Sequence, residues 1–117
     1  MPNTDRCLFC RIVTGEIVAK KVHEDDEVVA FNDINPQAPT HVLVIPRKHI
    51  PTLDDLTTAD TSIAGTLMVR SAQIARNLHL SSDGYRVVIN TGEAAGQTVF
   101  HIHAHILGGR NFGWPPG

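Results

Sequence analysis

The sequence predicts an α+β domain in which an antiparallel sheet packs against one long helix. A chain of 117 residues with 42% hydrophobic content is sufficient for a single core. Short runs rich in β-branched residues lie in both halves of the chain, and one long segment with helical spacing of apolar residues lies between them. We therefore expect one domain over residues 1–117, with about five antiparallel strands, one long helix and a short N-terminal helix.

The expected elements follow from apolar patterns and turn residues. A short helix is expected at 7–13 and the long helix at 58–80, because apolar residues recur there at helical spacing. Asp25 and Asp26 mark the turn of a hairpin. Pro46 should end the third strand, since proline cannot extend the ladder. The strands are expected, in chain order, at 20–24, 27–32, 40–45, 85–90 and 99–107.

The composition argues against two classes of partner. Charged residues make up 19% of the chain and the formal net charge is −2, which differs from the basic surface of proteins that grip a nucleic-acid backbone. The N-terminal residues lack the apolar segment of a secretion signal, and no later apolar run is long enough to span a bilayer. We expect a cytoplasmic protein with reduced cysteines that binds neither nucleic acid nor membrane.

The segment from His101 to Leu107 alternates between histidine and apolar residues. Successive side chains of a strand point to opposite faces, so the rings of His101, His103 and His105 are expected on one face, roughly 7 Å apart, lining a single pocket. The apolar residues between them then pack on the long helix. Imidazole can act as nucleophile, acid, base or ligand near neutral pH, so the row indicates a site where protons and phosphates move. Solvent-facing polar positions are the alternative.

The sequence around these histidines resembles the signature of the histidine triad (HIT) family. The matching segment reads GQTVFHIHAHIL at 96–107. Other segments resemble the Hint branch of this family, and they lie at 30–41, 44–49, 108–110 and 114–117. Only the segment at 52–83 is weakly diagnostic. The resemblance implies a HIT-type fold.

The resemblance also implies an activity. Members of the Hint branch hydrolyse the P–N bond of purine nucleoside 5′-phosphoramidates, such as conjugates of AMP with an amine or with lysine. The implied nucleophile is the middle histidine, His103, which would form a nucleotidyl-histidine that water then hydrolyses. His105 is implied to bind the phosphate and to donate a proton to the leaving amine. His101 is implied to orient the site, and His41 matches a fourth histidine of the site.

The same resemblance assigns residues to the nucleotide. Asp33 is expected to bind the ribose hydroxyls, since a carboxylate accepts hydrogen bonds from a diol. Asn90 and Thr98 are expected to offset the charge of the α-phosphate, and backbone amides at Gly96 and Gln97 to add donors. The base is expected between the apolar residues Leu8, Phe9, Ile12, Ile17, Phe31 and Ile34. For each apolar residue, an ordinary core position is the alternative.

Cys7 and Cys10 have the Cys-x-x-Cys spacing of half a tetrahedral zinc site. Two thiolates alone are a weak signal, because structural zinc has four ligands. The resemblance to bacterial members of the family supplies the other two, His49 and His101. We expect a structural Zn²⁺ that joins the N-terminal segment to the sheet, with no metal needed for catalysis. Two buried thiols without a metal are the alternative.

The residues at 110–117 are expected to form a C-terminal tail. Two prolines and two glycines exclude a helix there, while Phe112 and Trp114 are large aromatic residues. The resemblance implies a homodimer, paired through the long helix and the adjoining strand, in which this tail and Trp114 lie near the active site of the other subunit. Many relatives carry histidine at position 113, where this chain has glycine. The resemblance therefore does not imply which leaving group this chain prefers.

Three other functions fit parts of the sequence. A nucleotide-binding or scaffold protein with little turnover would bind AMP but form no covalent adduct at His103. An enzyme with the same nucleophile could act on dinucleoside polyphosphates or on adenylylated nucleic-acid ends, although the first branch carries Gln where this chain has His105 and the second carries basic extensions. The histidines could also hold a catalytic metal, although alternate residues of one strand rarely converge on one ion without further ligands.

Overall fold

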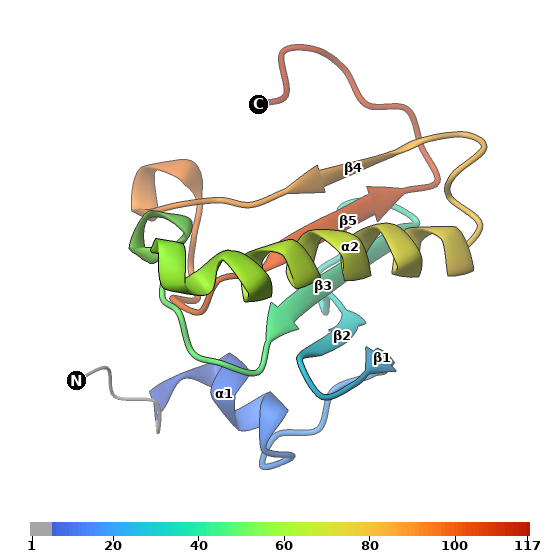
Figure 1. Cartoon of the computed structure of the whole chain (residues 1–117). Helices are drawn as coiled ribbons and strands as arrows, with labels where there is room; N and C mark the ends of the chain where they lie inside the picture. Colours follow the sequence, from blue (N-terminus) through green and yellow to red (C-terminus); the bar gives the residue numbers. More distant parts are fainter. Residues whose placement is uncertain (1–5) are drawn as a thin grey trace.

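A computed structural model of the chain describes residues 6–117, so residues 1–5 of the expected domain lie outside the described part. Five antiparallel strands form one sheet in the order β1-β2-β3-β5-β4, with a long helix, α2, and a short N-terminal helix, α1 (Figure 1). The elements are α1 Leu8–Val13, β1 Lys21–Glu24, β2 Val28–Asn32, β3 Thr40–Pro46, α2 Thr61–Asn77, β4 Tyr85–Val88 and β5 Ala104–Gly108. The predicted α+β architecture is confirmed. No helix within residues 6–117 is long and apolar enough to cross a membrane.

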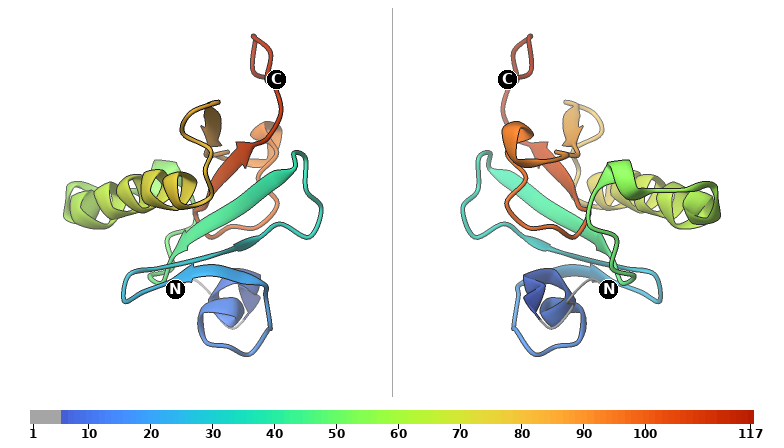
Figure 2. Two further views of the ribbon diagram at one scale, coloured as in Figure 1. Left: turned by 90° about the vertical axis from the view of Figure 1, so that its right-hand side faces the viewer. Right: turned by 90° about the vertical axis from the view of Figure 1, so that its left-hand side faces the viewer.

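The central strands of the sheet separate two apolar layers, one under each helix (Figure 2). On β3, Val42 and Val44 are buried in the layer that includes α2. Leu43 and Ile45 are buried in the other layer, which includes α1. Because both faces are covered, β2 and β3 consist almost entirely of apolar residues instead of alternating with polar ones.

The last strand presents its apolar residues to α2, as the alternation predicts. Ile102, Ala104 and Ile106 are all buried in the layer that includes this helix. Since side chains of extended residues alternate between faces, His103 and His105 lie on the opposite face, beside α1. The sheet therefore positions these histidines in the second layer, under the short helix.

The last strand is shorter than predicted, because it begins at Ala104 and not at Val99. In the register of β3 with β5, two residues beyond the last pair, Val44 with Ala104, Pro46 would lie opposite Ile102. Proline has no N–H to donate to a neighbouring strand. Instead, the N–H of Ile102 donates to the carbonyl of Ile50, 2.6 Å away. The residues before Ala104 therefore leave the ladder and contact the chain that follows β3.

The long helix is also shorter than the predicted 58–80. The three residues before α2 form a separate 3-10 turn, in which the carboxylate of Asp60 accepts a hydrogen bond of 3.0 Å from the N–H of Thr57. This capping box marks the start of the turn, which leads directly into α2. Beyond the other end of α2, His79 adopts a left-handed conformation with φ of 62°, which turns the chain out of the helix.

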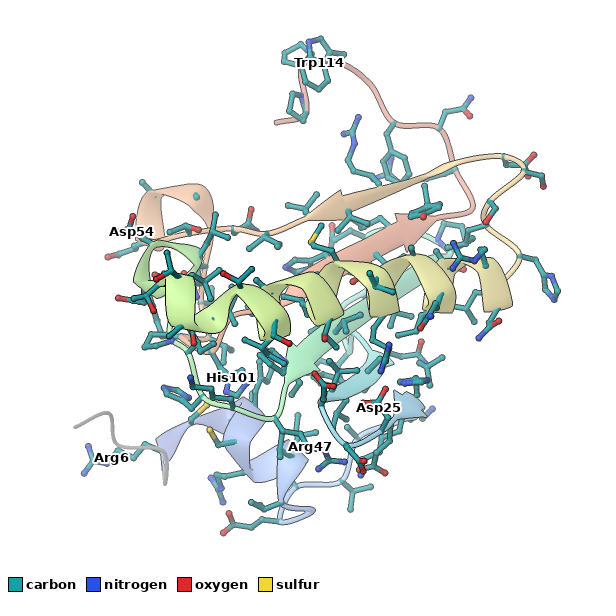
Figure 3. The ribbon with its side chains drawn as sticks, viewed as in Figure 1. Arg6, Asp25, Arg47, Asp54, His101 and Trp114 are labelled. Carbon is teal, nitrogen blue, oxygen red and sulfur yellow. The ribbon has the colours of Figure 1, made fainter. Side chains whose placement is uncertain are left out.

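The turn between β1 and β2 is tied to α2 by Asp25 (Figure 3). One carboxylate oxygen of Asp25 accepts hydrogen bonds from the N–H groups of Glu27 and Val28, at 2.8 and 3.0 Å. The other lies 2.6 Å from Nε2 of His23 and 2.7 Å from Nε of Arg70, a residue of α2. Burial raises the pKa of Asp25, but these hydrogen bonds outweigh it and hold the pKa well below its usual range.

The ion pair between the turn and α2 predicts a stability effect. Arg70→Ala removes a charge-assisted hydrogen bond to a partly buried carboxylate and should lower the free energy of unfolding by about 1–2 kcal/mol. Urea unfolding measures the change. Arg76→Ala, an exposed position of the same helix, is the matched control and should change it by less than about 0.5 kcal/mol. Equal effects of the two substitutions would contradict the assignment.

Candidate active site and metal centre

A cavity of about 910 Å³ opens on the α1 side of the sheet. Its volume falls within the range of sites that enclose a small organic ligand. It is bounded by α1, the segment leading into β1, the end of β2 and the chain around β5. Most of the predicted nucleotide-binding residues and two of the histidines line it, namely Leu8, Phe9, Ile12, Ile17, Phe31, Asp33, Ile34, Thr98, His103 and His105.

The cavity combines a buried apolar wall with an exposed apolar rim. Ile12 and Phe31 are buried, at 5% exposure each. Ile34 is 101% exposed and Val18 is 93% exposed, although both line the cavity. Apolar side chains that the protein itself leaves in solvent at the edge of a cavity favour a flat, partly hydrophobic ligand.

Some residues of this cavity were not predicted from the sequence. The additional lining residues are Val18, Ala19, Lys20, Asn32, Leu43 and Val99. The alternation of β3 could have identified Leu43, because it lies on the face of that strand away from α2. The segment before β1 has no motif that marks it, and only the path of the chain brings it to the cavity.

Four predicted residues are not part of the cavity wall: Asn90, Gly96, Gln97 and Trp114. Gln97 is buried; its side-chain oxygen accepts from the N–H of Gly92 at 2.9 Å and its amide group donates to the carbonyl of Pro51 at 2.8 Å. The N–H groups of Gly96 and Gln97 donate to the carbonyls of Glu93 and Gly92, at 3.0 Å each. The backbone N–H groups of Gly96 and Gln97 and the side chain of Gln97 are therefore engaged in hydrogen bonds that stabilise the loop. Among the predicted phosphate donors, the Thr98 hydroxyl is the one whose residue lines the cavity.

His103 is held in a single orientation. Its Nδ1 lies 2.8 Å from the carbonyl oxygen of His101 and must donate, since a carbonyl can only accept. The neutral ring therefore carries its proton on Nδ1 and its lone pair on Nε2. The ring is 8% exposed and packs edge-on against Phe9, with 5.0 Å between the centroids. This burial lowers the pKa of His103 and favours the neutral form, in which Nε2 is a nucleophile.

A second hydrogen-bonded group lies beside His103. Nδ1 of His41 accepts from the backbone N–H of Gln37 at 3.0 Å, so the proton of His41 is on Nε2. That nitrogen lies 2.9 Å from Nδ1 of His105 and 3.4 Å from Oδ2 of Asp33. Donation to His105 places the proton of His105 on its Nε2. The rings of His103 and His105, 5.0 Å apart, thus carry opposite tautomers.

Burial keeps this group of histidines neutral. It lowers the pKa of His41, against the charge of Asp33. It lowers the pKa of His105 to about 4, and the neighbouring His103 and His41 act in the same direction. An anion that enters the cavity would favour the charged form of these histidines and would therefore raise their pKa.

A second cluster, here called the Cys2His2 cluster, consists of Cys7, Cys10, His49 and His101. The four ligand atoms all lie within 4.8 Å of one another. Sγ of Cys10 is 3.2 Å from Nδ1 of His49, and both thiols are 3.4 Å from Nδ1 of His101. A tetrahedral zinc site with ordinary bond lengths has edges of roughly 3.3–3.8 Å between such atoms. The cluster can therefore hold a metal ion.

The chemistry of this donor set also fits a metal. Burial and the adjacent Cys7 together raise the pKa of the Cys10 thiol to about 12, so a cation is needed to favour the thiolate. Nε2 of His101 donates to the carbonyl of Pro46 at 2.7 Å, which leaves Nδ1 as the ligand nitrogen. Such an outer hydrogen bond is typical of metal-bound imidazole.

The expectation that all three histidines line one pocket is wrong for His101. Its ring is fully buried and faces the Cys2His2 cluster, whereas His103 and His105 line the cavity. The ring centroids of His103 and His105 are 5.0 Å apart. The reason that His101 differs is the early end of the ladder, which frees the chain before Ala104 to turn.

We also tested the alternative that histidines of the site hold a catalytic metal. Asp33, His41 and His105 do have ligand atoms within 4.8 Å of one another. However, Nε2 of His41 carries a proton, because Nδ1 of that ring accepts from a backbone N–H. A protonated nitrogen 2.9 Å from Nδ1 of His105 is a hydrogen-bond donor and not a metal ligand.

The C-terminal tail is held against the sheet as far as Gly113. The guanidinium groups of Arg110 and Arg86 lie 4.2 and 5.1 Å from the centroid of the Phe112 ring. Arg86 also donates to the carbonyl of Gly113 at 2.8 Å. Trp114 is 85% exposed and projects away from the rest of the chain (Figure 3).

Comparison with known proteins identifies the family, because the HIT domain model matches residues 14–112. The chain belongs to the HIT domain family. A HIT family hydrolase from Legionella pneumophila superposes with a TM-score of 0.94 at 49% identity, covering 96% of this chain and all of that one. A histidine triad protein from Clostridium difficile gives 0.90 at 43% identity, covering 97% of each. The purine nucleoside phosphoramidase of Escherichia coli is 43% identical over 93% of this chain and 92% of its own length.

The Cys2His2 cluster of this HIT domain predicts metal-dependent stability. His49→Asn removes one ligand and should lower the bound metal per chain by more than half and the midpoint of thermal unfolding by several degrees. Elemental analysis of protein purified without an affinity tag measures the first quantity, and calorimetry the second. His79→Asn, an exposed histidine in a left-handed conformation that asparagine tolerates, is the control and should match wild type. Unchanged metal content in His49→Asn would refute the site.

The lowered pKa of His105 predicts a loss of stability in acid. The unfolded chain binds a proton below about pH 6.5, whereas folded His105 does so only near about 4, so the free energy of unfolding should fall as the pH falls through that window. His105→Gln should reduce the slope by up to about 1.4 kcal/mol per pH unit. Urea unfolding at several pH values tests this, with His79→Asn as control. A slope unchanged in His105→Gln would contradict the burial argument.

Proposed function

We propose that this HIT domain is a hydrolase that cleaves the P–N bond of purine nucleoside 5′-phosphoramidates, with His103 as nucleophile. The observation that carries the proposal is the hydrogen bond from Nδ1 of His103 to the His101 carbonyl, in a ring that lines the cavity. It leaves the lone pair of Nε2 free for attack on phosphorus. The 43% identity to the purine nucleoside phosphoramidase of Escherichia coli supports the choice of substrate class.

The reaction divides into two displacements at phosphorus. In the first, Nε2 of His103 attacks the α-phosphorus, the P–N bond breaks, and the amine leaves with the electron pair of that bond and takes a proton. His105 is the proposed proton donor, because its ring is next to that of His103. In the second, water attacks the nucleotidyl-histidine, gives a proton to His105, and releases the nucleoside monophosphate and neutral His103. The sum is hydrolysis of the P–N bond.

Substrate binding itself is proposed to charge His105. The ring is neutral in the free protein, since its pKa is about 4. The negative α-phosphate next to it would raise that pKa and favour the imidazolium that a proton donor requires. The Asp33 carboxylate raises the pKa of both histidines and so favours the charged form, whereas the neighbouring His41 lowers the pKa of His105.

The remaining cavity residues are proposed to bind the nucleotide. Asp33 accepts one hydrogen bond of 2.8 Å from the N–H of Asn35, which leaves acceptor capacity on the carboxylate for the ribose hydroxyls. The purine would lie between the exposed rim at Val18 and Ile34 and the buried wall at Phe31, where its apolar faces are covered. The Thr98 hydroxyl would donate to the phosphate.

For the Cys2His2 cluster we propose structural Zn²⁺. Two thiolates and two imidazoles at tetrahedral distances are the donor set that zinc prefers. Four protein ligands leave no open position, so the ion would hold α1 and the chain after β3 together and take no part in the reaction. The homodimer and the approach of Trp114 to the partner's site stay predictions from the resemblance, and the cytoplasmic location stays a prediction from the sequence.

A quench experiment tests the proposed activity. Wild-type protein mixed with adenosine 5′-phosphoramidate and quenched in the first turnovers should yield an adenylylated peptide that spans residues 99–107, detected by mass spectrometry. His103→Ala should give no adduct and should lose at least about a thousandfold in kcat, as expected for removal of a nucleophile. Its affinity for AMP, measured by titration calorimetry, should stay within about tenfold of wild type.

Other results would point to other functions. Tight AMP binding by wild type without adduct or turnover would favour a binding protein. Faster turnover of a dinucleoside polyphosphate than of the phosphoramidate would reassign the substrate. An adduct on a residue other than His103 would overturn the mechanism.

A further inference from the structure

We infer that Arg110, which follows the last strand, is a positioning residue for the site. It acts through the backbone of Gln37, and the group that it positions is the ring of His41. The geometry stands by itself, whereas its catalytic meaning rests on the proposed function. Arg110 is exposed and is not part of the cavity wall, so it does not touch the substrate.

Three consecutive hydrogen bonds link Arg110 to the cavity. Nε of Arg110 donates to the carbonyl of Gln37 at 2.9 Å. The N–H of Gln37 donates to Nδ1 of His41 at 3.0 Å. Nε2 of His41 lies 2.9 Å from Nδ1 of His105, which lines the cavity. Gln37 is therefore held on both sides of its Cα, by Arg110 on one side and by His41 on the other.

The hydrogen bond from Gln37 decides which tautomer His41 adopts. A neutral imidazole can carry its proton on either nitrogen, and the N–H of Gln37 stabilises the form with a free Nδ1. If that donor moved away, the proton of His41 could shift to Nδ1. Nε2 would then accept from His105 instead of donating to it. His105 would carry its proton on Nδ1 and present the lone pair of Nε2 to the cavity, so the nitrogen that meets the substrate would change from a donor to an acceptor.

The loop that contains Gln37 lies close to the segment that carries Arg110. Pro36 and Pro39 have no N–H, so neither can donate a backbone hydrogen bond within the loop. Gly109 has φ of 88°, and a Cβ on it would lie 2.9 Å from Cβ of Pro39. Only glycine permits this approach of the two segments, which brings Arg110 within reach of the Gln37 carbonyl.

Arg110 is itself fixed by the tail. Its guanidinium lies 4.2 Å from the centroid of the Phe112 ring, and it donates to the carbonyl of Asn111 at 3.0 Å. Arg86 contacts the same ring at 5.1 Å and donates to the Gly113 carbonyl, but its described hydrogen bonds do not include Gln37. Arg86 is therefore a matched control, because its removal takes one guanidinium from the same ring and leaves the contacts of Arg110 with Phe112, Asn111 and Gln37 in place.

The ¹⁵N resonances of the His41 imidazole report its tautomer directly. Wild type and Arg86→Ala should show a protonated Nε2 and an unprotonated Nδ1, whereas Arg110→Ala should show a mixture of the two tautomers. With adenosine 5′-phosphoramidate, Arg110→Ala should lower kcat about threefold to tenfold at nearly unchanged KM, a fraction of the full contribution of general acid–base catalysis. Arg86→Ala should leave kcat within about twofold of wild type.

The two readouts separate the inference from the proposed function. A wild-type tautomer pattern for His41 in Arg110→Ala would overturn the inference, whatever the activity. Absence of hydrolysis by wild type would contradict the proposed function, and the ¹⁵N pattern would still decide the role of Arg110. Phe112→Ala keeps Arg110 but removes the ring beneath it, so it should give the same shift to a smaller extent. No shift in Phe112→Ala, if Arg110→Ala does not fold, would also refute the inference.

Discussion

The hydrogen bond from Nδ1 of His103 to the carbonyl of His101 is the constraint on which the candidate site depends. It assigns the proton of a buried ring to one nitrogen and leaves the other with its lone pair. The bond can form because the chain before Ala104 is not part of the ladder, so the His101 carbonyl is not needed by a neighbouring strand. An interruption of regular structure thus supplies the acceptor that orients His103, the proposed nucleophile.

His101 joins this site to the Cys2His2 cluster. Its ring faces the thiols of Cys7 and Cys10, and its carbonyl holds His103. The helix α1 has only six residues, which is too short to be stable by itself. It is held by the apolar contacts of Phe9 and Ile12 and by the cluster at its start. Because α1 also forms a wall of the cavity, a metal in the cluster would stabilise the shape of the ligand site without entering it.

Individual residues show which structural features the sequence predicts correctly and which it does not. The alternation of 101–107 correctly placed Ile102, Ala104 and Ile106 under the long helix, since a period of two residues is a local property of extended chain. The same alternation failed for His101, because the pairing with β3 stops at Ala104 and the chain before it leaves the ladder. Gln97 was expected at the phosphate, yet its polar atoms all bond within its own loop and to Pro51.

The sequence by itself determined the class of fold, the faces of the strands and the chemical types that meet at the site, because periodicity and residue chemistry are local. Tertiary structure decided which ring nitrogens carry protons and which groups are their hydrogen-bond partners. The ring of His101 bonds to Pro46, which is 55 residues away, and Arg110 bonds to Gln37, which is 73 residues away. A tautomer depends on which backbone group lies within about 3 Å of each ring nitrogen, and no local pattern contains that information.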